Sequence, residues 1–219
     1  MPDRQDKGAG PERRVSRPTQ AGVLVVVSGP SGVGKSTICK EVVKRLPSAF
    51  LSISCTTRPP GPGEVNGKDY WFISRDQFEQ GIAQGRFLEY AEVFGNLYGT
   101  PREPIEQALG QGKVVILEID VQGARQVKQV FPGALLVFIM PPKDVALKQR
   151  LQGRARDDQT TIERRLRQAQ QEIEAAKGLY QYFIVNDDLD KTVDEVIAVI
   201  SKIAGQALVE NSDDRGSKE

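Results

Sequence analysis

The sequence predicts an α/β fold in which helices cover both faces of a parallel sheet. Short, almost continuous aliphatic runs alternate with helical patterns, and strands that are buried on both faces have this composition. One turn-rich segment interrupts the alternation and indicates an inserted subdomain. The length of 219 residues suffices for one such domain with a well-buried core. The runs expected as strands are residues 23–27, 114–117, 135–139 and 182–185.

Helical patterns follow these runs, so right-handed crossovers are expected between the parallel strands. The expected helices are residues 36–46, about 124–131, from about 144 onward, and about 189–204. Both ends of the chain are polar and are predicted to be flexible tails, because they have too little apolar surface to bury. The resulting predicted division is a tail at 1–20, a domain at 21–207 with its core at 21–50 and 102–207, and a tail at 208–219.

The turn-rich segment, about 51–101, is predicted to form an α+β subdomain above the core. Asn66-Gly67 lies between short β-prone pieces, which is a hairpin signal. One helical pattern inside the segment opens with Ser74 and Gln77, the two positions of a capping box. The other turn signals are the run Pro59-Pro60-Gly61-Pro62-Gly63 and the pair Gly95-Asn96.

The composition excludes several classes of function. Thirty basic and 29 acidic residues nearly cancel, so no electrostatic footprint for bulk nucleic-acid binding is present. No apolar run approaches the roughly 20 residues that span a bilayer. The chain has no histidine, which rules out a histidine base or metal ligand. The two cysteines, Cys39 and Cys55, are too few for a disulfide framework and favour a reducing, cytoplasmic compartment.

The first expected strand is followed by a phosphate-binding loop. Residues 29–37 read GPSGVGKST, a complete G-x-x-x-x-G-K-[ST] motif between a strand and a helix. The glycines let successive backbone N–H groups point into one concavity, and the N-terminus of the next helix favours anions there. Lys35 can reach the terminal phosphates of a nucleotide, and the Ser36 hydroxyl can ligate magnesium. The sequence therefore predicts a P-loop NTPase-type core.

A basic stretch near residue 150 precedes a long helical pattern that Thr160 and Glu163 open as a second capping box. One interpretation is a solvated helix face. The other is phosphate binding, since planar guanidinium groups pair bidentately with phosphate oxygens. The basic residues are Arg150, Arg154, Arg156, Arg164 and Arg165.

Taken together, the ordered motifs of the chain resemble those of the guanylate kinase family, from about residue 23 to about 203. The motifs are GPSGVGKST, SCTTRPPGPGEVNGKDYWF, FLEYAEVFGNLYGT, VILEIDVQGA, RLQGR and FIVNDDLD. The resemblance implies a parallel-sheet core, a GMP-binding subdomain at about 51–101 and a helical lid at about 145–165. It also implies phosphoryl transfer from ATP to GMP, with Mg²⁺ as the metal. The oligomeric state and the use of dGMP stay open.

The resemblance assigns roles residue by residue. The residues expected at ATP are Gly29, Pro30, Ser31, Gly32, Val33, Gly34, Lys35, Ser36 and Thr37, with Asn186 and Asp187 near the adenine. Those expected at GMP are Ser54, Arg58, Tyr70, Glu89, Tyr98, Thr100 and Asp120. The expected catalytic cations are Lys35, Arg58, Arg150, Arg154 and Arg165, and the expected metal ligands are Ser36 and Glu118.

The chemistry of guanine gives an independent reason for the assignment of Glu89. The pairing edge of guanine presents two adjacent donors, a ring N–H and an amino group, and one carboxylate accepts both. Adenine presents a ring acceptor there, so a site built on a carboxylate rejects it strongly, on the order of 10⁴-fold. The hydroxyls of Ser54 and Thr100 are expected to donate to acceptors of the base.

Three positions depart from the family pattern. Gly61 stands where the family usually has a second arginine on the GMP phosphate, so one phosphate contact is missing. Glu118 stands where an aspartate is common, and Ala155-Arg156 replaces a commoner Gly-Thr in the lid. Two other functions are compatible with this fold. One is a kinase for another monophosphate, and the other is a non-catalytic interaction module of this fold, against which the intact phosphate loop argues.

Overall fold

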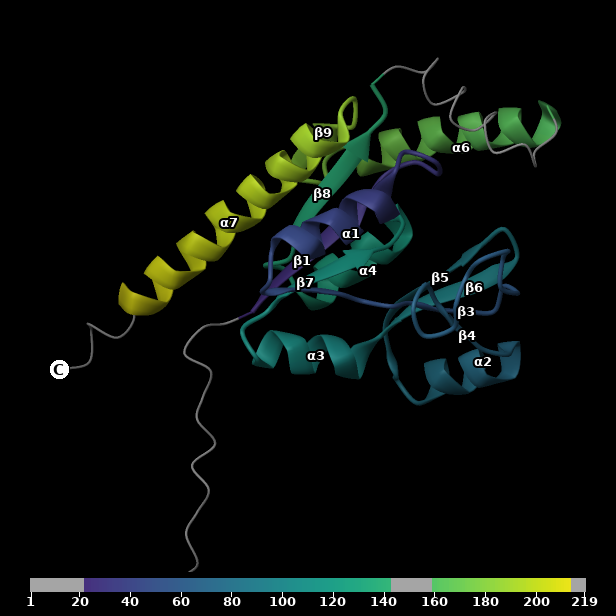
Figure 1. The fold of residues 1–219 in the computed structure, drawn as a ribbon. Helices are drawn as coiled ribbons and strands as arrows, with labels where there is room; N and C mark the ends of the chain where they lie inside the picture. Colours follow the sequence, from purple (N-terminus) through teal and green to yellow (C-terminus); the bar gives the residue numbers. More distant parts are fainter. Residues whose placement is uncertain (1–21, 143–158, 214–219) are drawn as a thin grey trace, which may run out of the picture.

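A computed structural model describes residues 22–142 and 159–213, with the side chains of 22–142 and 167–205. Its centre is a parallel sheet of five strands in the order β2-β7-β1-β8-β9 (Figure 1). Four of these strands coincide with the expected aliphatic runs, and β2 was not predicted. Their bounds are β1 Val23–Ser28, β2 Ala49–Leu51, β7 Val114–Glu118, β8 Leu135–Met140 and β9 Tyr182–Val185.

Helices lie on both faces of this sheet because its central strand contributes to two cores. Val25 and Val27 pack with α1 and α7 on one face, whereas Leu24 and Val26 pack with α3, α4 and the end of α6 on the other. Nearly every residue of β1 is therefore apolar, as a strand buried on both faces requires. The helices are α1 Lys35–Arg45, α3 Arg102–Gly110, α4 Val121–Val130, α6 Gln159–Ala176 and α7 Leu189–Asp213.

Several boundaries differ from the sequence predictions. Helix α4 begins at Val121 because Asp120 caps it, with the carboxylate oxygen Oδ1 accepting from the Gly123 N–H at 2.8 Å. Helix α6 begins at Gln159, so the predicted cap Thr160 lies inside the helix. Helix α7 runs past the predicted end at residue 204 to Asp213. The helix expected from about 144, and most of the expected lid at 145–165, lie outside the described residues.

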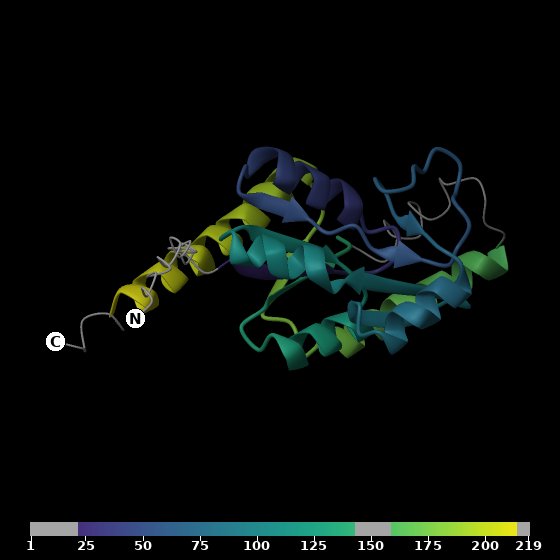
Figure 2. The ribbon, with the colours of Figure 1, turned by 90° about the horizontal axis from the view of Figure 1, so that it is seen from below.

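The inserted segment forms a second sheet in the order β4-β3-β6-β5, with helix α2 packed against it (Figure 2). Figure 2 also shows that this subdomain and the C-terminal end of α7 lie at opposite ends of the molecule. The predicted capping box of α2 is confirmed, since Ser74 and Gln77 exchange both hydrogen bonds. The elements are β3 Cys55–Thr56, β4 Trp71–Phe72, α2 Arg75–Ala83, β5 Phe87–Val93 and β6 Asn96–Pro101.

The hairpin of the subdomain is not at the predicted place. Strands β5 and β6 form it, and its two-residue turn is Phe94-Gly95, both with positive φ. Such turns match the twist of the flanking strands. Asn66-Gly67 instead makes a local turn in which the Gly67 N–H donates to the carbonyl of Tyr70 at 2.8 Å. The hairpin prediction for Asn66-Gly67 is therefore wrong.

Among the described residues, no helix has the length and apolarity needed to cross a membrane.

Candidate active site

A cavity of about 660 Å³ lies where the C-terminal ends of β1 and β7 face the subdomain. Its wall combines the phosphate loop, the loop before β4, the β5–β6 hairpin and helix α6. The carboxyl ends of parallel strands are where ligands bind in open α/β sheets. The expected site residues that line the cavity are Gly29, Ser31, Gly32, Gly34, Lys35, Ser36, Thr37, Ser54, Arg58, Tyr70, Glu89, Tyr98, Glu118 and Asp120.

The phosphate loop has the backbone conformation that its glycines permit. Gly32 and Gly34 have φ values of 84° and 104°, which other residues rarely adopt. Lys35 begins helix α1, and its Nζ donates to the carbonyl oxygens of Gly29 at 2.5 Å and Pro30 at 3.2 Å. The ammonium group therefore lies over the concavity of its own loop. Pro30 and Val33, also expected at ATP, are buried and do not line the cavity.

Asn186, the residue that follows β9, supports the phosphate loop. Its side-chain amide donates to the carbonyl of Val33 at 2.7 Å, and its oxygen accepts from the Thr192 hydroxyl at 3.3 Å. A Cβ atom at Gly34 would lie 2.8 Å from the Asn186 amide nitrogen, so a larger residue there is excluded. Neither Asn186 nor Asp187 lines the cavity, so the structure gives Asn186 a bracing contact, and the adenine assignments stay predictions.

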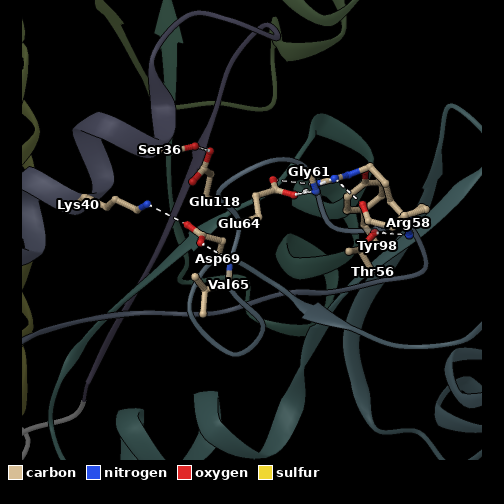
Figure 3. A network of polar contacts seen from close by, with 11 residues as sticks. Ser36, Lys40, Thr56, Arg58, Gly61, Glu64, Val65, Asp69, Tyr98 and Glu118 are labelled. Carbon is tan, nitrogen blue, oxygen red and sulfur yellow. Dashed lines mark hydrogen bonds and ion pairs between the residues drawn. The ribbon is translucent and has the colours of Figure 1, made fainter.

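Ser36 and Glu118 meet at the base of the phosphate loop. The Ser36 hydroxyl donates to Glu118 Oε1 at 2.6 Å, from the first turn of α1 to the end of β7 (Figure 3). The described residues contain no cluster of three carboxylate, cysteine or histidine ligands. Mg²⁺ in nucleotide sites needs no such cluster, since it takes one or two protein oxygens together with phosphates and water. This hydroxyl–carboxylate pair therefore fits a metal ion that a nucleotide brings with it.

Arg58 lies beside two neighbouring aromatic rings at the opposite side of the cavity. Its guanidinium carbon lies 5.5 Å from the ring centroid of Tyr70 and 5.7 Å from that of Phe72. Its Nε donates to the Tyr98 hydroxyl at 3.3 Å. Burial raises the pKa of Tyr70 to about 12, so its hydroxyl keeps its proton and can donate to an anion. The predicted cluster of Arg58, Tyr70 and Tyr98 is thus assembled in space.

Glu64 is a site residue that the sequence reasoning missed. It accepts from Arg58 Nη1 at 2.9 Å and Nη2 at 2.8 Å, and from the backbone N–H of Gly61 at 2.5 Å (Figure 3). The same contacts raise the pKa of Arg58 and lower that of Glu64, the side-chain hydrogen bond being the first cause of each. In the sequence, Glu64 is marked only by its place inside the motif SCTTRPPGPGEVNGKDYWF, which gives it no role of its own.

Glu89 is a buried residue of the cavity wall, with 4% of its surface exposed. The register of the β5–β6 hairpin pairs it with Thr100, whose hydroxyl donates to Glu89 Oε1 at 2.5 Å. Burial raises the pKa of Glu89 to about 7, while the hydrogen bond from Thr100 acts in the opposite direction. Thr100 does not line the cavity and its proton is committed to Glu89. The expectation that Thr100 donates directly to a base is therefore not met.

Gly123 leaves the space that Glu89 occupies. A Cβ atom built there would overlap Oε2 of Glu89 and lie 2.9 Å from its carboxyl carbon. Asp120, the cap of the same helix, also lines the cavity, and its charge contributes to raising the pKa of Glu89. A glycine in the first turn of α4 thus lets a buried carboxylate lie against the helix.

Helix α6 adds Gln168 and Glu172 to the cavity wall, and neither was predicted. The Gln168 amide donates to Glu172 Oε1 at 3.1 Å, and burial raises the pKa of Glu172. Arg150 and Arg154 lie outside the described residues. Arg165 lies within α6, and its side chain is also outside the described set.

One ion pair joins the core to the subdomain beside the cavity. Lys40 of helix α1 donates to Asp69 Oδ1 at 3.2 Å, and Asp69 Oδ2 accepts from the Val65 N–H at 3.0 Å (Figure 3). The lysine is largely exposed, so solvent screens the pair and it adds little to stability. Asp69 directly precedes Tyr70 in the chain. The pair therefore connects the part of the cavity wall that contains Tyr70 to α1, the helix that follows the phosphate loop.

Comparison with known proteins places these features in one family. The family model described as guanylate kinase matches residues 21–203. The guanylate kinase of Synechocystis sp. is 49% identical over 181 residues, covering 83% of this chain and 94% of the relative. The guanylate kinase of Carboxydothermus hydrogenoformans is 51% identical over 180 residues, covering 82% and 88%.

A solved structure agrees with the sequence relatives. The crystal structure of guanylate kinase from Anaplasma phagocytophilum superposes with a TM-score of 0.71 at 34% identity, covering 84% of this chain and 86% of that one. The matched range includes the phosphate loop, the whole subdomain and helix α6, so all described cavity residues lie inside it. The chain therefore belongs to the guanylate kinase family.

Proposed function

We propose that this chain transfers the terminal phosphoryl group of ATP to GMP, giving ADP and GDP, with Mg²⁺ as the metal. The observation that carries the proposal is one cavity that joins a nucleotide-phosphate loop to a buried carboxylate. Lys35 and Ser36 lie at the donor end, and Arg58 and Glu89 lie on the acceptor side. The free thiols of Cys39 and Cys55 agree with the cytoplasmic location expected from the sequence.

The reaction needs no general base. An oxygen of the GMP phosphate is already an anion and attacks the terminal phosphorus of ATP in line. The bond from that phosphorus to the ADP oxygen breaks, and the electron pair leaves with ADP. Catalysis then rests on positioning and on stabilisation of charge. A chain without histidine is suited to this chemistry.

The residues at the donor end hold and orient the phosphates of ATP. The N–H groups of the phosphate loop favour the polyphosphate, and Lys35 turns from its own loop carbonyls toward the transferred group. Ser36 and Glu118 would hold Mg²⁺, which neutralises phosphate charge when bound.

On the acceptor side, Arg58, Tyr70 and Tyr98 bind the phosphate of GMP. Glu89, in its ionised form, accepts the two donors of guanine, and Ser54 and Asp120 line the same cavity. Thr100 acts through Glu89, because its hydroxyl fixes the orientation of that carboxylate.

The charge of the cavity supports a requirement for further cations. Its described lining contains two cations, Lys35 and Arg58, and five carboxylates, Glu64, Glu89, Glu118, Asp120 and Glu172. Two anionic substrates would be repelled by such a wall if it acted alone. The cations that complete the site are then, together with Mg²⁺, Arg150, Arg154 and Arg165.

Selective phosphorylation of GMP is the direct test. An assay coupled to ADP release, with GMP, dGMP, AMP, CMP and dTMP as acceptors, should give turnover with GMP far above AMP, CMP and dTMP. Equal rates with AMP would contradict the guanine assignment of Glu89. Absence of turnover with every acceptor would favour a non-catalytic interaction module. The dGMP reaction measures the contribution of the ribose 2′-hydroxyl.

Replacing Gly61 by arginine is expected to lower the KM for GMP about tenfold, the value of one added charge-assisted hydrogen bond. A Cβ atom at Gly61 lies 3.0 Å from Glu64 Oε2 and 3.6 Å from Arg58 Nη1, so the new side chain starts beside the guanidinium group. Glu64 Oε2 needs to move by only a few tenths of an ångström to accommodate it, so its hydrogen bonds to Arg58 and Gly61 are kept. Initial rates at saturating ATP measure the change.

The matched control is Gly133→Arg, which adds the same charge at an exposed glycine with open space around it. Its KM for GMP should equal that of the unmodified chain. A higher KM in Gly61→Arg would show that position 61 does not face the phosphate.

A further inference from the structure

Glu64 occupies a fixed place in the cavity wall. It lies in the irregular segment between β3 and β4, where its backbone N–H donates to the carbonyl of Gly61 at 3.1 Å. Its carboxylate accepts a hydrogen bond from the Gly61 N–H at 2.5 Å, so the two residues are joined by two hydrogen bonds. This short turn holds the carboxylate in place without any contribution from Arg58.

Arg58 has few donors left for a ligand. A guanidinium group has five N–H donors in a rigid plane. Nε is bonded to Tyr98, Nη1 to both the carbonyl of Pro59 and Glu64, and Nη2 to Glu64. Among the described residues, these contacts leave one N–H of Nη2 without a partner. Tyr70 and Phe72 lie near the guanidinium group, which limits its movement out of this plane.

Two roles for Glu64 are consistent with a carboxylate on an arginine of a phosphate site. It either occupies the place of the GMP phosphate and must leave, or it anchors Arg58 from the side. Leaving would cost three hydrogen bonds, two of them to a charged group and one to a backbone N–H. The backbone of Gly61 also holds the carboxylate independently of Arg58. The contacts therefore favour an anchor.

We propose that Glu64 is a positioning residue for the acceptor phosphate, an inference that rests on the proposed function. It holds the guanidinium plane of Arg58 so that the remaining Nη2 N–H and the hydroxyls of Tyr70 and Tyr98 act together on one phosphate. Because residue 61 is a glycine, Arg58 has no neighbouring guanidinium group in this turn, and Glu64 supplies the rigidity instead. Most of the negative charge of Glu64 is already paired by three donors.

Binding of GMP and of guanosine to Glu64→Ala tests this role. Guanosine has the same base and ribose without the phosphate, so it reports on the base pocket alone. Titration calorimetry of the full chain should show the Kd for GMP raised about tenfold, as expected for loss of one oriented charge-assisted contact. The Kd for guanosine and the KM for ATP should not change. Glu64→Gln keeps one acceptor oxygen, so its Kd for GMP should lie between that of the unmodified chain and that of Glu64→Ala.

Glu79→Ala is the matched control, since Glu79 also accepts from an arginine, Arg75 at 2.9 Å, but does not line the cavity. Tighter GMP binding by Glu64→Ala would identify Glu64 as a competitor of the phosphate and overturn the proposal. Equal weakening for GMP and guanosine would show general damage to the subdomain and also overturn it. Binding of GMP without turnover in the unmodified chain would refute the proposed function, while the Glu64 comparison would still decide its own question.

Discussion

Substitution of Lys35 by methionine is expected to lower kcat for GMP phosphorylation by about a thousandfold, with a small change in the KM for GMP. Among the described residues that line the cavity, Lys35 is the only lysine. It lies at the donor end, where charge develops on the transferred phosphoryl group. Methionine has a similar length and keeps the packing of the stem. The acceptor side, which Arg58 and Glu89 form, is left intact.

Lys44→Met provides a matched control on the same helix. Lys44 is largely exposed and pairs with Glu41 at 3.3 Å, outside the cavity lining. Single-turnover measurements separate the chemical step from product release, and thermal unfolding shows whether each variant is folded. Full activity of Lys35→Met would mean that the cations of another segment neutralise the transferred group and that the loop only holds ATP.

Strands β1, β7 and β8 of the core sheet could be predicted because they are buried on both faces. In β1, Val25 and Val27 face one core and Leu24 and Val26 face the other, so no polar position interrupts the run. Strand β2 was missed because it has only three residues, all half-buried, and pairs with β7 alone. Helix α3 was missed because it follows Pro101 without a side-chain cap and buries little beyond Ile105 and Ala108.

The donor end of the site could be predicted because the phosphate loop carries its chemistry in consecutive residues. The acceptor side depends on contacts between distant elements. Thr100 acts on Glu89 only because of the register of a hairpin, and Gly123 matters only because α4 packs against β5. Gln168 and Glu172 read as ordinary polar positions of an amphipathic helix, since nothing in their spacing shows that they face a cavity.

Replacing Glu89 by glutamine is expected to raise the KM for GMP at least a hundredfold and to leave the KM for ATP nearly unchanged. The amide keeps one acceptor oxygen but turns an N–H₂ group toward the second donor of guanine. An amide donor can instead pair with the ring nitrogen of adenine, so the preference for GMP over AMP should collapse. Glu92→Gln, an exposed carboxylate on the same strand, is the matched control. Unchanged GMP kinetics in Glu89→Gln would remove Glu89 from the site.

The same substitution should change how stability depends on pH. Burial raises the pKa of Glu89 from its ordinary 4.5 to about 7, so the folded state holds this proton more tightly than the unfolded state. Stability is therefore lost as pH rises from about 4.5 to 7, and at pH 8 the ionised carboxylate costs on the order of 3 kcal/mol. Glu89→Gln should melt at a higher temperature than the unmodified chain at pH 8, and the difference should vanish below pH 4.5.

Binding of GMP requires the ionised carboxylate of Glu89. The affinity for GMP should therefore increase with rising pH, whereas the stability of the fold decreases. As pH falls below about 7, the KM for GMP should rise toward tenfold per pH unit, because protons compete with the base for Glu89. The phosphate of GMP also titrates near pH 6, but it does so equally in both proteins. The ratio of the KM values in the unmodified chain and in Glu89→Gln therefore isolates the carboxylate. A ratio that is constant from pH 6 to pH 8 would show that Glu89 is ionised throughout and that its burial does not govern base recognition.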